Sequence, residues 1–435
     1  MVAFNDFLLL LDGYLSGSWW FPAFLIGTGI FFTAYLGFPQ FKFFAHGWRI
    51  VTGKYAKEDT KGETSPFEAL TTAMSGAVGT GNIGGVALAI WIGGPAAIFW
   101  MWITAIFGMT TKFVEVTMAH KYRTTLSDGS ISGGPMYYIE KSFNKRWAGV
   151  LFAALMMICA IGSGNMPQIN NIASVLDSTF SIPKLATGLI LGVMLWMIIA
   201  GGIKRIAKIA SKLVPIMAVI YFGGALVVVA ENYQNIIPSF HSIFSQVFSG
   251  SAAAGGFLGA SFAMSLKLGV ARGLYSNEAG QGSAAIAHST AKTKYPIREG
   301  AVAMLGPYID TLIICTMTGL VIISTGASAK YLGIESEQRL IGGGVSACAV
   351  CDGFFYKGQE VAIVGGGDTA AEEATYLANI CSKVTMLVRR DEMRASKAMQ
   401  HRVNSKENID LRYNTEVVEV VGENVVEGLK IINNK

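Results

Sequence analysis

The chain has 435 residues, of which 52% are hydrophobic and 14% charged, and its net charge at pH 7 is +5. So apolar a composition is unusual for a single soluble domain, which makes membrane insertion the first hypothesis. The basic residues are scattered over loops, which argues against a nucleic acid partner, and five cysteines are too few for a disulfide framework.

The N-terminus has neither a basic region nor a small-residue cleavage site, so we expect no removable signal peptide. Eight apolar segments then follow that are long enough to cross a hydrocarbon core, which needs about 20 helical residues. These expected spans are 17–38, 67–93, 96–117, 148–166, 185–201, 213–231, 253–288 and 300–324. Charged residues become more than twice as frequent after residue 324, so we expect a boundary inside the stretch TGLVIISTGASAKYLGI, residues 318–334.

The segments between the expected spans alternate in charge. Lys and Arg are frequent in 39–66, 118–147, 202–212 and 289–299, whereas 1–16, 94–95, 167–184 and 232–252 contain only Lys184. This alternation follows the positive-inside rule. It predicts a multi-pass protein of the plasma membrane, in contact with the lipid bilayer, whose N-terminus and C-terminal region lie outside.

Two of the expected spans contain helix-breaking sequence. The second includes SGAVGTGNIGGVA, residues 75–87, with five glycines, and the long seventh span ends in RGLYSNEAGQGSAAIAH. Unpaired backbone is tolerated at membrane depth only where it lines a cavity, and paired broken helices are typical of transporter sites. Half-helix N-termini can hold a carboxylate, and unwound carbonyls can hold Na⁺.

The small, polar and charged residues of the expected spans also have structural interpretations. A single small residue in a span more often serves helix packing than ligand binding, although polar Thr80 and Asn82 beside the glycines favour a site. Gly79–Gly84 matches G-x-G-x-x-G but follows no strand, so dinucleotide binding is not expected there. Asp310, in the middle of the eighth span, has either a site or gating role or a structural polar partner. Lys267 is expected to be packed or snorkelling, and Glu115 to be interfacial.

The motifs SGAVGTGNIGGVALAIWIGGP, DGSISGGPMYYIE and ARGLYSNEAGQGSAAIAHSTAKT resemble the alanine or glycine:cation symporter family over residues 15–324. The resemblance implies a LeuT-type fold of two inverted five-helix repeats after one extra helix, in the inner membrane of a bacterium. It also implies alanine or glycine uptake coupled to sodium. The implied substrate contacts are Thr80, Gly81, Ser265, Gly269, Ser276 and Asn277, the last four near the break of the seventh span. The implied sodium contacts are the side chain of Asn82 near one ion and the carbonyls of Ser75 and Val78 near another. Asp310, from its place in the eighth span, is predicted as a further sodium contact.

The family has ten core helices after the extra one, whereas only seven core spans are expected here, two of them in the second repeat. The sodium site between core helices one and eight would lack half of its ligands. We therefore expect a transporter bundle with impaired activity.

The soluble part begins with an apolar strand at 360–364, followed by Gly365-Gly366-Gly367, a helix from Asp368 to about Ile380 and a strand at 383–388. This order and the G-x-G-x-x-A spacing predict a Rossmann-like βαβ unit that holds a pyrophosphate at the helix N-terminus. Arginines after the second strand suit a 2′-phosphate, which indicates NADPH. The predicted cofactor contacts are Gly365, Gly367, Asp368, Thr369, Arg389, Arg390 and Arg394.

A C-x-x-C precedes this unit. No second pair or histidine cluster follows at zinc spacing, so a redox pair is expected in place of a zinc site. The motifs TGASAKYLGIESE, GVSACAVCDGFFYKGQEVAIVGGGDTAAEEA and RRDEMRA resemble bacterial thioredoxin reductase over 325–435. The resemblance implies that Cys348 and Cys351 form the dithiol that takes electrons from FAD, with Asp352 as the nearby acid, and that thioredoxin is the parent family's partner. The FAD-binding parts of that family are not found in this sequence.

The expected organisation is a transmembrane symporter domain at 1–324, a flavin-domain remnant or linker at 325–343 and a partial NADPH domain at 344–435. The first functional hypothesis is a sodium-coupled alanine or glycine symporter in a truncated chimera. The alternative is an NADPH-dependent disulfide oxidoreductase tethered to the membrane, and a redox-gated transporter is a third. We expect the intact polypeptide to perform neither activity well.

Overall fold

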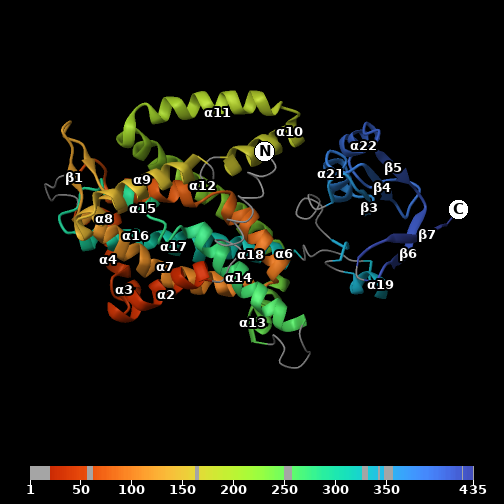
Figure 1. Ribbon diagram of the computed structural model, residues 1–435, viewed down its shortest axis with the longest axis horizontal. Helices are drawn as coiled ribbons and strands as arrows, with labels where there is room; N and C mark the ends of the chain where they lie inside the picture. The colour runs from red at the N-terminus through yellow and green to blue at the C-terminus, as the bar shows by residue number, and fades with distance from the viewer. Residues whose placement is uncertain are drawn as a thin grey trace. The chain divides into compact units, whose positions relative to one another are not determined.

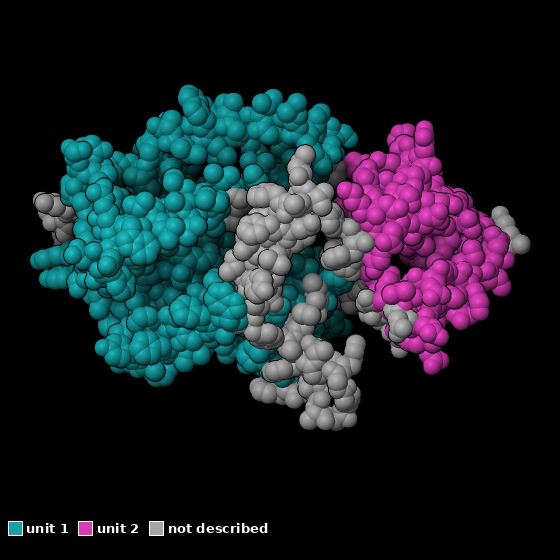
Figure 2. All heavy atoms as spheres, viewed as in Figure 1, with its two compact units in different colours: residues 1–327 teal, residues 328–435 magenta. Residues whose placement is uncertain are grey.

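The computed structural model describes residues 20–55, 62–161, 166–248, 257–325, 332–340, 343–346, 356–423 and 425–434. Side chains are described within these ranges except for 257–264 and a few single positions. The chain forms two compact units, Met1–Ala327 and Ser328–Lys435, which Figure 2 colours teal and magenta. Each unit is described by itself.

Unit 1 is helical apart from the short antiparallel pair β1 (Thr124–Thr125) and β2 (Ile131–Ser132) (Figure 1). Its first half contains α2 (Trp20–Tyr35), α3 (Pro39–Lys42), α4 (Phe44–Val51), α5 (Pro66–Ala77), η1 (Gly81–Gly85), α6 (Val86–Gly93), α7 (Ala96–Lys121), α8 (Pro135–Phe143) and α9 (Arg146–Cys159). The second half contains α10 (Met166–Phe180), α11 (Lys184–Ile199), α12 (Gly202–Glu231), η3 (Tyr233–Asn235), α13 (Ile236–Phe248), α14 (Phe257–Asn277), α15 (Ser283–His288), α16 (Pro296–Ala303), α17 (Leu305–Pro307), η4 (Tyr308–Cys315) and α18 (Thr316–Ser324).

Helix α7 is at the centre of unit 1. It is in contact with α2, α13, α14, α15 and α16, and side chains along its whole length are buried. Such burial on every side is typical of a helix enclosed by neighbours. Small residues allow the close approach, since a Cβ at Gly108 would lie 3.0 Å from the Cβ of Ala279.

Three helices are long and apolar enough to cross a membrane: Ala96–Lys121, Gly202–Glu231 and Pro296–Ser324. The helices Pro66–Ala77 and Gly81–Trp91 would together make a fourth span, bent by 58°. Three shorter apolar helices, α2, α9 and α11, complete the set within the described residues. Unit 1 is therefore a helical assembly compatible with a membrane, and the count of eight spans stays a prediction.

Large apolar side chains are exposed on several helices of unit 1. Helix α11 contacts α10 and α12, lies at the edge of the assembly in Figure 1 and exposes Leu185, Leu189, Val193 and Trp196. Helix α12 exposes Ile216, Val219, Ile220 and Val227. A soluble protein rarely exposes so many large apolar side chains together, whereas lipid tails would cover them.

Helix α18, the last helix of unit 1, is held to its neighbours by polar contacts along its length. Trp102 Nε1 donates a hydrogen bond to Thr316 Oγ1 at 2.7 Å, and the Tyr221 hydroxyl is hydrogen-bonded to that of Thr318. At the end of the helix, Asn235 Nδ2 donates to the carbonyl oxygen of Ser324 at 2.8 Å. These bonds come from α7, α12 and η3, so three different elements hold α18 in place.

Unit 2 is a small α/β assembly with the order α19 (Glu335–Arg339), β3 (Glu360–Val364), α21 (Asp368–Leu377), β4 (Lys383–Leu387), α22 (Lys397–Asn404), β5 (Ile409–Arg412), β6 (Thr415–Val421) and β7 (Gly428–Asn433). Strands β3, β4 and β5 form a parallel sheet in that order, and β6 and β7 form an antiparallel pair. The buried core of the unit includes Ala371, Ala374, Val384, Met386 and Val403. The predicted first strand agrees with β3, while the helix ends three residues before Ile380.

Candidate functional site

The first half of the site is the break in the second expected span. Helix α5 starts with a capping box between Ser65 and Glu68 and ends at Ala77. Val78 then adopts an extended conformation, and a π-helical turn, η1, leads into α6. The break predicted from the glycines is therefore present. The glycines also leave room for neighbours, because a Cβ at Gly79 would lie 2.5 Å from Gln168 Nε2.

The second half of the site consists of the seventh and eighth expected spans. Helix α14 ends at Asn277 and α15 begins at Ser283. In the loop between them Glu278, Gly280 and Gly282 have positive φ, and the backbone N–H groups of Gly280 and Gly282 face the carboxylate of Glu115 on α7. Glu115 is buried in this contact. The eighth span contains the π-helical segment η4, and such segments are frequent at functional sites.

These breaks bring together a set of buried polar side chains, here called the Asn82–Asp310 cluster. Its members are Asn82, Ser276, Asn277, Asp310, Thr311 and Cys315. Asn82 Nδ2 donates to Asp310 Oδ1 at 2.6 Å and lies 3.0 Å from Ser276 Oγ. Asp310 Oδ2 accepts from the hydroxyls of Ser276, at 2.7 Å, and Thr311, at 2.8 Å. Both carboxylate oxygens are thus hydrogen-bonded.

The cluster has the chemistry of a site for a small hard cation. A buried carboxylate is costly unless a cation, a proton or a charged side chain compensates it. Lys112 lies close enough to interact with Asp310 electrostatically, and no ion pair to Asp310 occurs among the described residues. Carboxylate, hydroxyl and amide oxygens are the ligands that hard cations prefer.

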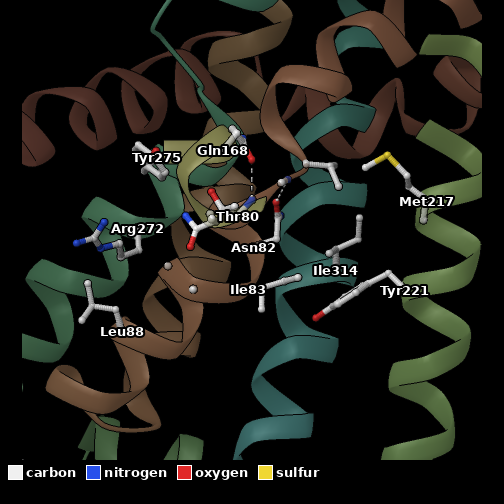
Figure 3. Close-up of a pocket in the computed structure, with 17 residues that line it drawn as sticks. Thr80, Asn82, Ile83, Leu88, Gln168, Met217, Tyr221, Arg272, Tyr275 and Ile314 are labelled. Atoms are coloured by element: carbon white, nitrogen blue, oxygen red, sulfur yellow. Dashed lines mark hydrogen bonds between the residues drawn. The ribbon is translucent and has the colours of Figure 1, made fainter. Parts of the chain in front are cut away.

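A cavity of about 590 Å³ lies beside the cluster and is lined by η1, α10, α12 and α14. Figure 3 shows Gln168 directed toward the break, where its Oε1 accepts a hydrogen bond from the backbone N–H of Thr80 at 3.2 Å. The polar side chains on its wall are Thr80, Asn82, Gln168, Asn171, Tyr221, Arg272 and Tyr275. A volume of this size is typical of small-molecule sites.

Asn82 joins the cavity to the cluster. Its Oδ1 accepts a hydrogen bond from the backbone N–H of Gly79 at 2.8 Å, while its Nδ2 bonds Asp310. One amide side chain therefore fixes both the shape of the 79–82 turn and one oxygen of the buried carboxylate.

The residues predicted for the site separate into three groups: those in the cavity wall or the cluster, Ser75 on the surface of α5, and the pair Ser265 and Gly269. Val78, Thr80, Gly81 and Asn82 line the cavity, and Ser276, Asn277 and Asp310 lie in the cluster. Ser75 is exposed on α5, and its hydroxyl donates to the carbonyl of Thr72 at 2.7 Å.

Ser265 and Gly269 form the third group. They were expected near the break, but α14 continues to Asn277, so both lie inside the helix. Ser265 donates to the carbonyl of Gly93, and a Cβ at Gly269 would lie 2.5 Å from the carbonyl oxygen of Ala97. Both residues serve helix packing in the structure, and their role as substrate contacts stays a prediction.

Several cavity residues were missed from the sequence. Gln168 and Asn171 belong to α10, in a segment interpreted as a connection between spans, although two polar amides on one helix turn could have signalled a lined cavity. Arg272 and Tyr275 lie within the ARGLYSN motif, in which only the small and polar residues Ser276 and Asn277 were predicted to belong to the site.

In unit 2 the predicted cofactor residues gather at one edge of the parallel sheet. Val364 and Leu387 are register partners at the carboxyl ends of β3 and β4, so the loop 365–367 and the pair Arg389-Arg390 emerge side by side. Gly365 has φ +144°, and Gly367 is the N-cap of α21. The backbone N–H of Arg394 donates to the carbonyl of Gly366 at 2.7 Å, which folds the following loop onto the glycines.

Asp368, the first residue of α21, is held by hydrogen bonds from Ser396. Asp368 Oδ1 accepts a hydrogen bond from the backbone N–H of Ser396 at 2.8 Å, and this contact, with a further one to the Ser396 side chain, lowers the pKa of Asp368. Arg389 Nε lies 3.8 Å from Glu416 Oε1, which makes an ion pair. Thr369, on the first turn of α21, is exposed. Cys348, Cys351 and Asp352 lie outside the described residues.

Comparison with known proteins gives two matches along the chain. Residues 1–350 match the sodium:alanine symporter family, and residues 317–435 match the family of pyridine nucleotide-disulphide oxidoreductases. Sodium/alanine symporter AgcS of Methanococcus maripaludis is 43% identical over 330 residues, which are 74% of this chain and 72% of AgcS. Amino-acid carrier protein AlsT of Bacillus subtilis is 40% identical over 318 residues, 73% of this chain and 66% of AlsT.

Solved structures match the other end of the chain. Thioredoxin reductase of Lactococcus lactis is 37% identical, with a TM-score of 0.24, over 24% of this chain and 35% of that enzyme. Thioredoxin reductase of Streptococcus pyogenes is 38% identical, with a TM-score of 0.24, over 25% of this chain and 36% of that enzyme. The chain spans about a third of the length of these reductases.

Proposed function

The chain belongs to the sodium:alanine symporter family, and from this premise we propose that unit 1 is a sodium-coupled carrier of alanine or glycine. The observation that carries the proposal is the meeting of two broken helices and the π-helical segment η4 at the Asn82–Asp310 cluster, beside a cavity with polar side chains in its wall. A LeuT-type arrangement of inverted repeats accounts for two broken helices that face each other near the middle of the bundle.

In this proposal the amino acid occupies the cavity. The backbone N–H groups of Thr80 and Gly81 bind its carboxylate, and the side-chain amide of Gln168, now bonded to Thr80, is displaced or joins the contact. A glycine at position 81 keeps the ring of Tyr275 close, because a Cβ there would lie 3.2 Å from the ring. Ser276 and Asn277 support the site from the cluster behind it.

The cation occupies the cluster. Asp310 supplies the charge, the hydroxyls of Ser276 and Thr311 supply neutral oxygens, and Asn82 orients Asp310 through its Nδ2. The carbonyls near Ser75 and Val78 are proposed for a second sodium ion. Binding of the cation neutralises Asp310, fixes the orientation of Asn82 and thereby sets the turn 79–82 that meets the amino acid. This connection couples the two ligands in both directions.

The test is direct binding of radiolabelled alanine to the purified full-length chain as a function of Na⁺. We expect alanine to bind in Na⁺ and not in choline, with glycine as a competitor. Asp310→Asn removes the buried charge and should weaken the apparent Na⁺ affinity about tenfold or more, which is about 1.4 kcal/mol. Asp128→Asn, the same change at an exposed loop, serves as the matched control. Equal alanine binding in Na⁺ and choline, or an unchanged Na⁺ dependence in D310N, would contradict the proposal.

A second candidate function concerns unit 2. We propose that loop 365–367 and α21 hold the pyrophosphate of NADPH and that Arg389, Arg390 and Arg394 bind its 2′-phosphate. The meeting of the glycine loop and the arginine pair at one sheet edge favours this assignment. The redox role of Cys348 and Cys351, which would require FAD, remains a proposal from the resemblance.

The NADPH proposal is tested by cofactor binding to the full chain. NADPH should bind more tightly than NADH, and Arg389→Gln/Arg390→Gln should remove the difference. Lys357→Gln/Lys406→Gln, which deletes two charges elsewhere in unit 2, should keep it. Equal affinity of the wild-type chain for NADPH and NADH would overturn the assignment.

A further inference from the structure

Unit 1 contains a second cavity, of about 310 Å³, formed by the end of α4, the start of α5 and the segment before and within α16. Its wall includes Thr52, Tyr55, Phe67, Lys292, Lys294 and Arg298. None of these residues belongs to the site proposed above. The cavity lies where the segments 39–66 and 289–299 meet, and both segments are predicted to be cytoplasmic.

The charge of this cavity has one sign. Lys292, Lys294 and Arg298 line it, and no Asp or Glu lies among the described residues of its wall. The same positive charge acts on a neighbouring histidine. The pKa of His46 is lowered mainly by burial and further by repulsion from Arg298 and Arg49. An anion would relieve this repulsion.

The fold holds the guanidinium of Arg298 and the backbone of Lys292 in place. The guanidinium of Arg298 lies over the rings of Tyr55 and Tyr295, at 4.3 Å and 5.0 Å from their centroids. The backbone N–H of Lys292 donates to the carbonyl of Thr64 at 2.8 Å, and a Cβ at Gly62 would lie 2.6 Å from the Cα of Lys292. The fold therefore fixes the guanidinium of Arg298 and the backbone of Lys292, while the side chains of Lys292 and Lys294 are exposed and accessible to an anion.

Exposed apolar side chains lie on and next to the wall of the cavity. Phe67 lines it, Tyr295 and Ile297 are neighbours of Lys294 and Arg298 in the chain, and these three are each between 39% and 48% exposed. Trp48, also exposed, precedes Thr52 by one turn. Aromatic side chains of this kind lie at the interface between lipid headgroups and acyl chains. A headgroup phosphate would enter the basic cavity while the acyl chains cover these apolar side chains.

We propose that this cavity binds the phosphodiester headgroup of an anionic phospholipid in the cytoplasmic leaflet. Lys292 and Lys294 contact the phosphate oxygens, and Arg298, stacked between two tyrosine rings, closes the wall behind them. Basic pockets between membrane helices on the cytoplasmic side are suited to such headgroups. The proposal depends on the membrane insertion of the family and not on the transported substrate.

The experiment is native mass spectrometry of the purified full-length chain in detergent, titrated with phosphatidylglycerol or with phosphatidylcholine of the same acyl chains. The wild-type chain should retain phosphatidylglycerol preferentially. Lys292→Gln/Lys294→Gln should raise the apparent Kd for phosphatidylglycerol about tenfold or more, because each cation near an anionic lipid contributes several-fold in affinity. Lys292→Arg/Lys294→Arg should retain the binding, which separates charge loss from misfolding.

The matched control is Lys208→Gln/Lys212→Gln, which removes two exposed lysines of α12 from another predicted cytoplasmic segment and should leave the Kd unchanged. Equal loss in both double variants, or no preference for phosphatidylglycerol, would overturn the proposal. Inorganic phosphate that competes as well as the lipid at the same free concentration would also overturn it, in favour of a soluble anion. Alanine binding, measured separately, reports on the proposed transport function alone.

Discussion

At the scale of single residues, Asn82 and Ser265 show how much a side chain's partners decide its role. Both were predicted to lie in the site. Asn82 is hydrogen-bonded to the turn that lines the cavity and to the buried carboxylate of Asp310. The hydroxyl of Ser265 instead donates to the carbonyl of Gly93 at a contact between helices. Composition could not distinguish them, because small polar residues serve both purposes in membrane helices.

This difference leads to a prediction for two alanine variants. Asn82→Ala should weaken both Na⁺ and alanine affinity, because it releases the 79–82 turn and leaves Asp310 Oδ1 without its donor. Ser265→Ala should change thermal stability and leave both affinities within about twofold of wild type. Binding titrations and melting curves of the two purified variants provide the measurement. A larger affinity loss in S265A than in N82A would reassign the site.

A pH-dependent contact is expected at Asp368 in unit 2. The folded pKa of this carboxylate is lowered by Ser396, so the stabilising contact is present above its usual pKa of about 4 and is lost as the pH falls through the lower folded value. Hydrogen exchange of the Ser396 amide in the full chain, corrected for intrinsic rates, should accelerate in that range. Asp368→Asn should remove this pH dependence, while Asp391→Asn, an exposed neighbouring acid, should preserve it.

At the scale of elements, the loop between α14 and α15 depends on Glu115. The backbone N–H groups of Gly280 and Gly282 in this loop face the buried carboxylate, and Lys112 lies within electrostatic reach. Glu115→Ala would leave the loop amides and a buried lysine uncompensated, so we expect destabilisation of about 1 to 3 kcal/mol. Glu115→Gln should lose less, because its amide oxygen still accepts. Thermal unfolding in detergent tests this order, with Glu231→Ala, an exposed acid on α12, as the control.

A second element-scale prediction concerns the ends of the two broken spans. The backbone N–H groups of Glu63 and Thr64 donate to the carbonyl of Thr290, and the carbonyl of Thr64 accepts from the N–H of Lys292. The hydroxyls of Thr64 and Thr290 are 3.0 Å apart. These contacts join the segment before α5 to the segment after α15. If transport requires the two to separate, a disulfide in Thr64→Cys/Thr290→Cys should stop alanine uptake, and a reductant should restore it.

The control for this cross-link is each single cysteine variant under the same oxidant. Peptide mapping by mass spectrometry should find the linkage only in the double variant. Continued uptake by fully cross-linked protein would show that the segments need not separate.

The comparison of prediction with structure is also clearest at this scale. The break at 78–80 could be predicted, because clustered glycines have one physical meaning in an apolar span. The second break lies later than expected, since Ser276 and Asn277 remain helical and the helix ends before a loop in which Glu278, Gly280 and Gly282 have positive φ. The π-helical turns that place Asn82 opposite Asp310 have no sequence signal. Gln168 lies 88 residues after Thr80 in the chain, so only tertiary packing determines their contact.

At the scale of the whole molecule, the two units have separate cores. The core of unit 2 lies among Ala371–Val403, whereas the other buried clusters belong to unit 1. All eight tryptophans precede residue 197, so tryptophan fluorescence reports on unit 1 alone.

We therefore expect unfolding in urea to occur in two stages. Unit 2 should unfold first, because its sheet is small and its core is stabilised by water exclusion, whereas membrane helices in detergent resist urea. Hydrogen exchange of peptides from β4 and α21 should change at lower urea than tryptophan fluorescence. Coincident midpoints would instead indicate one cooperative unit, and Trp196→Phe, which leaves the unit 2 core untouched, checks that the optical signal comes from unit 1.

The three hydrogen bonds that hold α18 have a mechanical consequence. Every residue of unit 2 follows α18 in the chain, so a force applied to the C-terminus is transmitted to Ser324 before it reaches any other part of unit 1. There the bond from Asn235 bears the load first, followed by the bonds at Thr318 and Thr316. Because the three are loaded in succession and not together, α18 would peel from its C-terminal end one bond at a time. Helix α18 therefore resists a pulling force on the C-terminus in steps, independently of the chemistry of unit 2.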